Sequence, residues 1–225
     1  SSSITTSVCG AFTVATAPSP TFTAQPGASA CSVVDVTYTT QSGQSTFVGH
    51  QAGGLSNDVR ASTYVGYKAG ASSTASYSSV FIGHKAGNGT TGSYNSVFIG
   101  SYAGSNDISP LEIPAKFSPF STFVGNSAGR GSPNSAYSTF IGYNAGYLQS
   151  GSNNIFIGYS TGYSQSGSNN IFIGNNTANN NQKISSSIAI GNYLLNNNNA
   201  QLNIGNELYA SNLYTGSLAS STPTA

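Results

Sequence analysis

One nine-residue phrase recurs along most of the chain and constrains its fold more than any other feature. At residues 79–87 this phrase is SVFIGHKAG. It returns as STFVGHQAG at 45–53, STYVGYKAG at 62–70, SVFIGSYAG at 96–104, STFVGNSAG at 121–129, STFIGYNAG at 138–146, NIFIGYSTG at 154–162 and NIFIGNNTA at 170–178. Two weaker copies follow, SIAIGNYLL at 187–195 and QLNIGNELY at 201–209. Most central glycines are 16 or 17 residues apart, and this period predicts a solenoid of about ten stacked coils.

The residues around the central glycine predict a short strand in each coil. Val, Ile or Thr flank an aromatic residue there, and all of these are strand formers. The aromatic column consists of Phe47, Tyr64, Phe81, Phe98, Phe123, Phe140, Phe156 and Phe172. Because successive strand side chains point to opposite faces, the aromatic column lines one face and the aliphatic residues line the other. The sequence therefore predicts an all-β fold whose core is a parallel β-solenoid.

A strand that is apolar on both faces is normally covered on both, whereas a thin coil has only one interior. We therefore expect the second face to pack against another copy of the chain, which predicts a homo-oligomer. Assigning aliphatic residues such as Ile190 and Ile204 to the interior places the aromatic column, Phe98 included, between chains. The reverse arrangement, with the aromatic column inside the roll, is the alternative.

The repeats resemble the head repeats of trimeric autotransporter adhesins, which carry an Asn-Ser-Val-Ala-Ile-Gly unit. They are more similar still to the Asn-Thr-aromatic-Ile-Gly-Tyr-x-Ala-Gly repeats of bacteriophage tail fibres and related bacterial surface fibres. In tail fibres of the intramolecular-chaperone class, such repeats precede a segment similar to LNIGNELYASNLYTG, found here at 202–216. The chain departs from the adhesin heads by having Phe where they have Ala.

The resemblance spans residues 45–209, about three quarters of the chain. It implies a left-handed parallel β-roll, with three chains around one axis. It also implies an extracellular location, on a cell surface or on a virion. The tail-fibre chaperone domain is absent, which fits a mature chain that ends near Ala225.

Residues 1–44 lie outside the repeats and are predicted to form a small N-terminal β module. Apolar and polar residues alternate in AFTVATA at 11–17 and again at 34–39, as in strands. The only two cysteines, Cys9 and Cys31, fall in this module. An even count in an extracellular protein favours one disulfide, with two buried free thiols as the alternative. At the other end, residues 210–225 are predicted to be a tail.

An insertion loop at 105–120 lengthens one interval between glycines by eight residues. It contains Asp107, Glu112 and Lys116 in a chain that is otherwise nearly uncharged. Insertions in repeat proteins often lie on the binding face, so these three residues are candidates for receptor contact. A loop that folds against the neighbouring chain would explain the insertion equally well. The other connections, such as ASSTASYS at 71–78, contain turn residues and are expected to stack into a continuous polar surface.

Composition argues against several classes of partner. Only 5% of residues are charged and the net charge is +1, which gives nucleic-acid binding little electrostatic basis. The apolar runs are four or five residues long, far from the roughly 20 that span a bilayer. We therefore expect a soluble or surface-attached protein with no nucleic-acid partner and no membrane insertion.

Catalytic and cofactor motifs are missing from the sequence. His50 and His84 share a repeat position with Tyr67 and Asn126, which indicates interchangeable surface residues rather than a general base. No phosphate loop, nucleophile elbow or metal-ligand cluster is present. Asp107 and Glu112 come nearest to the paired carboxylates of a glycosidase, but they lie in one loop. The sequence predicts no cofactor, no metal site and no enzymatic activity.

Two sets of tyrosines are candidates for a receptor surface. Tyr143 and Tyr159 share one repeat position, while Tyr147 and Tyr163 share another. Parallel stacking at about 4.8 Å per coil would set them in two ladders. We expect Gln149, Asn153, Gln165 and Asn169 to flank these ladders and so complete a surface suited to uncharged sugars. Alternatively, the rings merely cover corners of the roll.

The sequence thus predicts a trimeric adhesive fibre that binds a surface glycan or another cell-surface receptor. A subunit that polymerises into an extracellular filament through its N-terminal module is the second hypothesis. A glycan depolymerase of the tailspike kind is the third.

Overall fold

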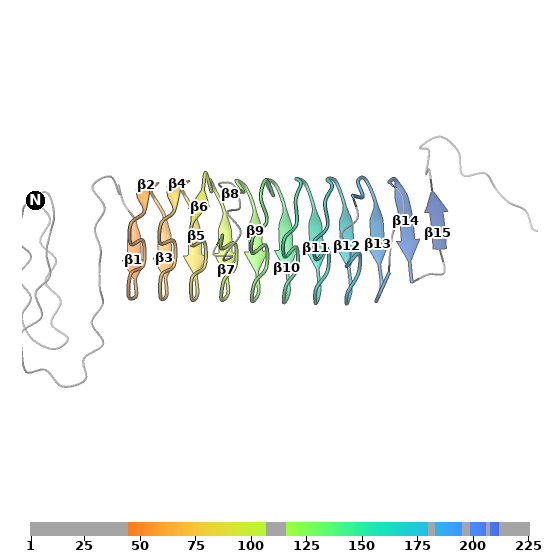
Figure 1. Ribbon diagram of the computed structural model, residues 1–225, viewed down its shortest axis with the longest axis horizontal. Helices are drawn as coiled ribbons and strands as arrows, with labels where there is room; N and C mark the ends of the chain where they lie inside the picture. The colour runs from red at the N-terminus through yellow and green to blue at the C-terminus, as the bar shows by residue number, and fades with distance from the viewer. Residues whose placement is uncertain (1–44, 107–115, 180–182, 195–198, 206–207, 212–225) are drawn as a thin grey trace, which may run out of the picture.

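The computed structural model describes residues 45–106, 116–179, 183–194, 199–205 and 208–211. The described part is a parallel β-solenoid of about eight turns, with no helix (Figure 1). The number of turns is lower than the ten or so predicted from the sequence. The predicted N-terminal module, including Cys9 and Cys31, lies outside the described residues.

One long sheet runs the length of the solenoid and takes one strand from each repeat. Its strands are β1 (Thr46–Val48), β3 (Thr63–Val65), β5 (Val80–Ile82), β7 (Val97–Ile99), β9 (Thr122–Val124), β10 (Thr139–Ile141), β11 (Ile155–Ile157), β12 (Ile171–Ile173), β13 (Ile188–Ile190), β14 (Gln201–Ile204) and β15 (Leu208–Ser211). Neighbours from β1 to β14 pair in parallel, with equivalent repeat positions opposite each other. The repeats therefore stack in register, as predicted. β15 pairs antiparallel with β14 and lies partly in the segment predicted to be a tail.

A second, shorter sheet forms another side of the coils in the N-terminal half. It contains β2 (Asn57–Arg60), β4 (Thr74–Tyr77), β6 (Thr90–Thr91) and β8 (Lys116–Phe117), also parallel. Isolated parallel bridges join Ser150 to Ser166 and Ser166 to Lys183. β8 lies within the predicted insertion loop, so the end of that insertion returns to the coil.

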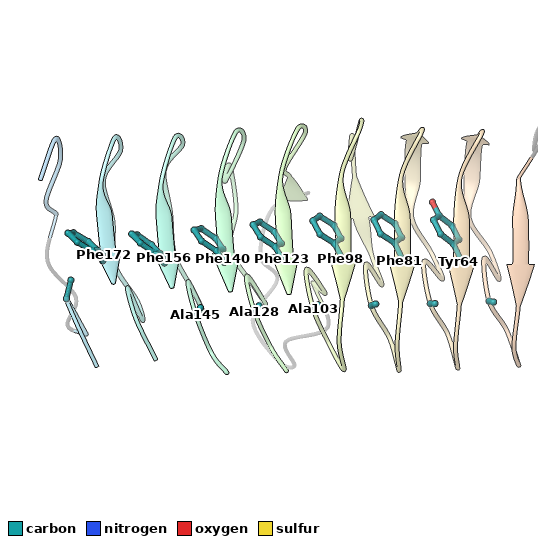
Figure 2. Close-up of a cluster of buried hydrophobic side chains, with 14 of the residues drawn as sticks. Tyr64, Phe81, Phe98, Ala103, Phe123, Ala128, Phe140, Ala145, Phe156 and Phe172 are labelled. Carbon is teal, nitrogen blue, oxygen red and sulfur yellow. The ribbon is translucent and has the colours of Figure 1, made fainter. Parts of the chain in front are cut away.

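The aromatic column lies inside the roll (Figure 2). From Tyr64 to Phe172 its rings are fully buried within a single chain. Ring centroids of neighbouring coils are 4.6–5.1 Å apart along this stretch, and the rings are nearly parallel. The placement of Phe98 between chains, with Ile190 and Ile204 inside, is therefore wrong. Ala189 and Asn203 continue the buried column, while Ile190 and Ile204 point outward.

Small residues shape the corner beneath each ring. Ala103, Ala128 and Ala145 are fully buried and form a second column beside the aromatic one (Figure 2). Gly104 follows at a φ of +63°, and a Cβ placed on it would lie 2.5 Å from Cδ2 of Phe98. The Ala-Gly pair therefore makes a tight corner, and the ring occupies the space that the missing Cβ leaves.

The connections between repeats are more buried than predicted. Ser73 and Ser76 lie in ASSTASYS and are fully buried rather than part of a polar surface. The hydroxyl of Tyr64 lies 3.4 Å from Oγ of Ser73, so this connection supplies a partner for the one phenol in the aromatic column. Burial raises the pKa of Tyr64 above its usual value.

Buried serines form a hydrogen-bonded ladder along the solenoid. The backbone N–H of Ser121 donates to Oγ of Ser96 at 3.3 Å, and the N–H of Ser138 donates to Oγ of Ser121 at 3.3 Å. These two hydroxyls also donate across the coil, Ser96 to the carbonyl of Ser118 at 2.9 Å and Ser121 to the carbonyl of Ser135 at 2.7 Å. The same ladder includes Ser45, Ser62, Ser79, Asn154, Asn170, Ser187 and Gln201. Side chains thus satisfy backbone donors that the sheets leave unpaired.

Candidate functional sites

The outer face of the long sheet is lined by two columns of mostly aliphatic side chains, which we call the aliphatic face. The column that precedes the aromatic residues contains Thr46, Thr63, Val80, Val97, Thr122, Thr139, Ile155, Ile171, Ile188 and Leu202, and the column that follows them contains Val48, Val65, Ile82, Ile99, Val124, Ile141, Ile157, Ile173, Ile190 and Ile204. None of these residues is charged. The face therefore runs from β1 to β14 without an ionised side chain.

The side chains of the aliphatic face are partly exposed to solvent, whereas those of the aromatic column are not. Ile99 and Ile141 are 37% and 38% exposed, whereas Phe98 and Phe140 between the two columns are fully buried. Single exposed apolar residues are ordinary, but large contiguous apolar patches mark interaction sites. The exposed apolar face of the sheet is thus aliphatic, which corresponds to the alternative arrangement with the aromatic column inside the roll.

The predicted tyrosine ladders are confirmed as stacked pairs. The ring centroids of Tyr143 and Tyr159 are 5.2 Å apart, and those of Tyr147 and Tyr163 are 5.0 Å apart. Tyr143 and Tyr159 are about half exposed, whereas Tyr147 and Tyr163 are half-buried. Partial burial raises the pKa of Tyr163, and the neighbouring Tyr147 adds to the shift.

The environment of these tyrosines differs from the prediction at two of the four expected polar neighbours. Gln149 and Gln165 are fully buried, so only Asn153 and Asn169 of the four expected polar neighbours are exposed. The amide of Gln149 bonds the carbonyls of Gly151 and Gly167 inside the coil.

Stacking also limits what the tyrosines offer to a ligand. The planes of Tyr143 and Tyr159 are within 9° of parallel, so each ring covers one face of the other. The next positions in their column are Asn126 and Asn175. The pair therefore offers only its two outer faces, together with ring edges and hydroxyls.

A second aromatic cluster, which includes basic side chains, lies in the N-terminal coils. His50, Tyr67 and His84 stack with centroid distances of 5.5 and 5.2 Å. Both histidines are exposed, in agreement with their assignment as surface residues. Tyr102 meets His84 edge to face at 5.0 Å. The Arg130 guanidinium lies 4.4 Å from the Tyr102 ring centre, a juxtaposition that sequence reasoning missed because the insertion separates the two residues along the chain.

A third group of polar residues lies on the second sheet. Asp58 pairs with Arg60 at 2.9 Å and accepts a short hydrogen bond from the hydroxyl of Tyr77. This hydrogen bond lowers the pKa of Asp58 and raises that of Tyr77. Tyr77 in turn stacks on Tyr94 at 5.1 Å. Asp58 is therefore a paired, surface-held carboxylate.

The charged residues of the insertion are not brought into a described site. Asp107 and Glu112 lie outside the described residues, and Lys116 begins β8. Their role in receptor binding stays a prediction. Among the residues that the structure describes, no group of three or more His, Cys, Asp or Glu could hold a metal ion. The described ranges also contain no helix long and apolar enough to cross a membrane.

Comparison with protein-family models, with curated proteins and with solved structures gave no match.

Proposed function

We propose that the chain is a non-enzymatic fibre subunit that assembles as a homotrimer and binds carbohydrate on a cell surface. The observation that carries the proposal is the aliphatic face, which runs uninterrupted from β1 to β14 on the outside of a complete, well-filled coil. Burial of such a face is favourable by about 25 cal/mol per Å². A second copy of the same chain offers an equally long and equally apolar surface at the same spacing.

The architecture supports a shaft rather than a compact binding domain. Parallel coils stack along one axis (Figure 1), and about 4.8 Å per strand gives a rod section of roughly 45 Å. Solenoids are open-ended structures that expose the same loop position on every coil. Three chains in a left-handed β-roll arrangement would shield their aliphatic faces at the common axis and leave the corner residues in solvent. We place this fibre outside the cell, on a cell surface or on a virion.

The corners of the coils provide the adhesive surface in this proposal. Tyr143 with Tyr159 and Tyr147 with Tyr163 offer ring edges, hydroxyls and outer faces. Aromatic side chains combine an apolar body with a polar group, which suits contact with a partner that is itself amphipathic. Uncharged sugars have this character, since each ring carries C–H groups as well as hydroxyls.

Measuring the mass of the purified chain by light scattering tests the assembly. We expect three times the 22.8 kDa of one chain. The double variant Ile99→Lys with Ile141→Lys should fall to the mass of one chain, because assembly would bury unpaired ammonium groups. Its circular dichroism spectrum should be unchanged, since both side chains already contact solvent in the single chain.

Leu55→Lys is the matched control, because Leu55 is 87% exposed and lies outside the aliphatic face. This variant should keep the trimeric mass. A single-chain mass for the unmodified protein would contradict the proposal, as would a trimer that tolerates the double variant.

A further inference from the structure

A strip of basic and aromatic side chains follows one corner of the N-terminal coils, and we call it the basic edge. It consists of His50, Tyr67, Lys68, His84, Lys85, Tyr102 and Arg130. Apart from Arg130, these residues come one or two positions after a central glycine. They belong to five successive coils, which corresponds to a strip roughly 20 Å long at the usual strand spacing.

Aromatic rings hold the cations of this strip in place. Nζ of Lys68 lies 5.4 Å from the ring centre of Tyr67, and Nζ of Lys85 lies 5.3 Å from that of Tyr102. Tyr102 also contacts Arg130, so two adjacent coils each bring a cation to its ring. Cation–π contacts of this kind are favourable while leaving the charged group in solvent.

Charge is unevenly distributed over the described side chains. Lys68, Lys85 and Arg130 gather at the basic edge, together with two exposed imidazoles. Asp58 is the one carboxylate in the part of the chain whose side chains the structure describes. It lies on β2 and is paired with Arg60. Among the described side chains, one sign of charge therefore lines this corner.

We propose that the basic edge binds an acidic polysaccharide that runs along the axis of the solenoid. Lys68 and Lys85 occupy the same position in neighbouring coils. Their ammonium groups lie against Tyr67 and Tyr102, rings that belong to coils two apart, about 10 Å along the axis. An extended polymer with a carboxylate on each sugar can meet these cations with charges spaced along its length, while sugar rings contact Tyr67 and the histidines. This inference rests on the proposed carbohydrate binding and names its chemical class.

A nucleic acid fits the basic edge less well. Duplex DNA carries one negative charge per about 1.7 Å of its axis, so a strip of this length would face many more phosphates than it has cations. The low overall charge of the chain provides no further neutralisation.

Binding of polygalacturonate, compared with its fully methyl-esterified and therefore uncharged form, tests the inference on the full chain. We expect the acidic polymer to bind more tightly than the esterified form at 50 mM salt and this difference to be lost at about 500 mM, because salt screens exposed charges. The double variant Lys68→Gln with Lys85→Gln should weaken binding about tenfold. Gln51 occupies the same repeat position with the same positive φ, so glutamine is compatible with this backbone.

Lys183→Gln is the matched control, because Lys183 is exposed and lies outside the basic edge. It removes one charge and should leave the affinity within about twofold. An equal loss in this variant, or equal binding of the esterified polymer, would overturn the inference.

Variants at the tyrosine pair separate this inference from the proposed function. Tyr147→Ser with Tyr163→Ser should reduce binding of the esterified polymer and leave the charge-dependent part intact. If only the uncharged polymer binds, carbohydrate binding stands and the basic edge is excluded as an acidic-sugar site. If neither polymer binds a chain that is trimeric by mass, the inference fails while the fibre assembly stands.

Discussion

At the scale of single residues, the packing of the aromatic rings and of neighbouring coils requires glycine at two positions of the repeat. Gly100 has a φ of +129°, and a Cβ on it would overlap the backbone of Gly125 in the next coil. Gly104 lies under the Phe98 ring. The first glycine therefore sets how closely coils approach, and the second lets the ring fill the corner. Both requirements recur in the other coils that contain the full phrase.

Gly104→Ala should destabilise the chain by more than Gly89→Ala. Both glycines have positive φ, +63° and +68°, and share a backbone penalty of about 1–2 kcal/mol. At Gly89 the nearest atom to a new Cβ is 3.5 Å away, whereas at Gly104 ring carbons of Phe98 overlap it. Overpacking should add about 1–3 kcal/mol. Thermal unfolding of the two variants measures the difference, and equal melting temperatures would show that the ring moves freely.

At the scale of elements, each strand is too short to be stable alone. The strands of the long sheet that carry the aromatic column contain three residues each, so each coil depends on bonds to the next. The serine ladder supplies bonds between the strands and across the coil. Where the chain turns, buried serine hydroxyls make the hydrogen bonds to backbone groups that water would otherwise make. The polar connections between repeats can therefore be buried in a fold with a thin core.

Ser96→Ala tests the ladder. The substitution removes the acceptor of the Ser121 N–H and the donor to the Ser118 carbonyl, and leaving buried groups unpaired costs about 1–3 kcal/mol. Urea unfolding should show this loss. Ser101→Ala is the control, because the half-buried Ser101 side chain makes no hydrogen bond to the residues that the structure describes. A Ser96 variant as stable as the Ser101 variant would mean that water replaces the hydroxyl.

At the scale of the whole molecule, the chain is a stack in which each coil contacts its neighbours. Stability in such solenoids is close to a sum of coil and interface contributions. β15 pairs antiparallel with β14, so the parallel ladder ends there rather than continuing into another coil.

Deleting one full period should therefore shorten the rod without unfolding it. Removing residues 143–158 joins Gly142 to Tyr159 and restores an unbroken repeat. We expect a β-sheet circular dichroism spectrum and a modestly lower melting temperature. Removing residues 151–158 alone joins Ser150 to Tyr159, which deletes β11 and leaves Gly142 and Gly174 24 residues apart, longer than one period and shorter than two. This control should lower the melting temperature further, because the joined segment cannot form a whole number of coils; an equal loss in the full-period deletion would contradict the picture of stability as a sum of coil and interface contributions.

The sequence by itself determined the repeat, the strand in each coil, the in-register parallel stacking and the stacked tyrosine pairs. These follow from local spacing, because equivalent residues meet whenever coils of equal length stack. Spacing likewise predicted that aromatic and aliphatic side chains occupy opposite faces.

Only the tertiary structure decided which face of the strands is inside. Side chains alternate between the two faces of a strand whether the aromatic or the aliphatic residues point inward, so the alternation does not distinguish the two arrangements. The Ala and Gly columns leave a slot that a flat, stacked ring such as Phe98 fills, and this turns Ile99 outward. The meeting of Arg130 with Tyr102 also depends on the tertiary structure. An insertion separates the two residues along the chain, and the stacking of coils places one over the other.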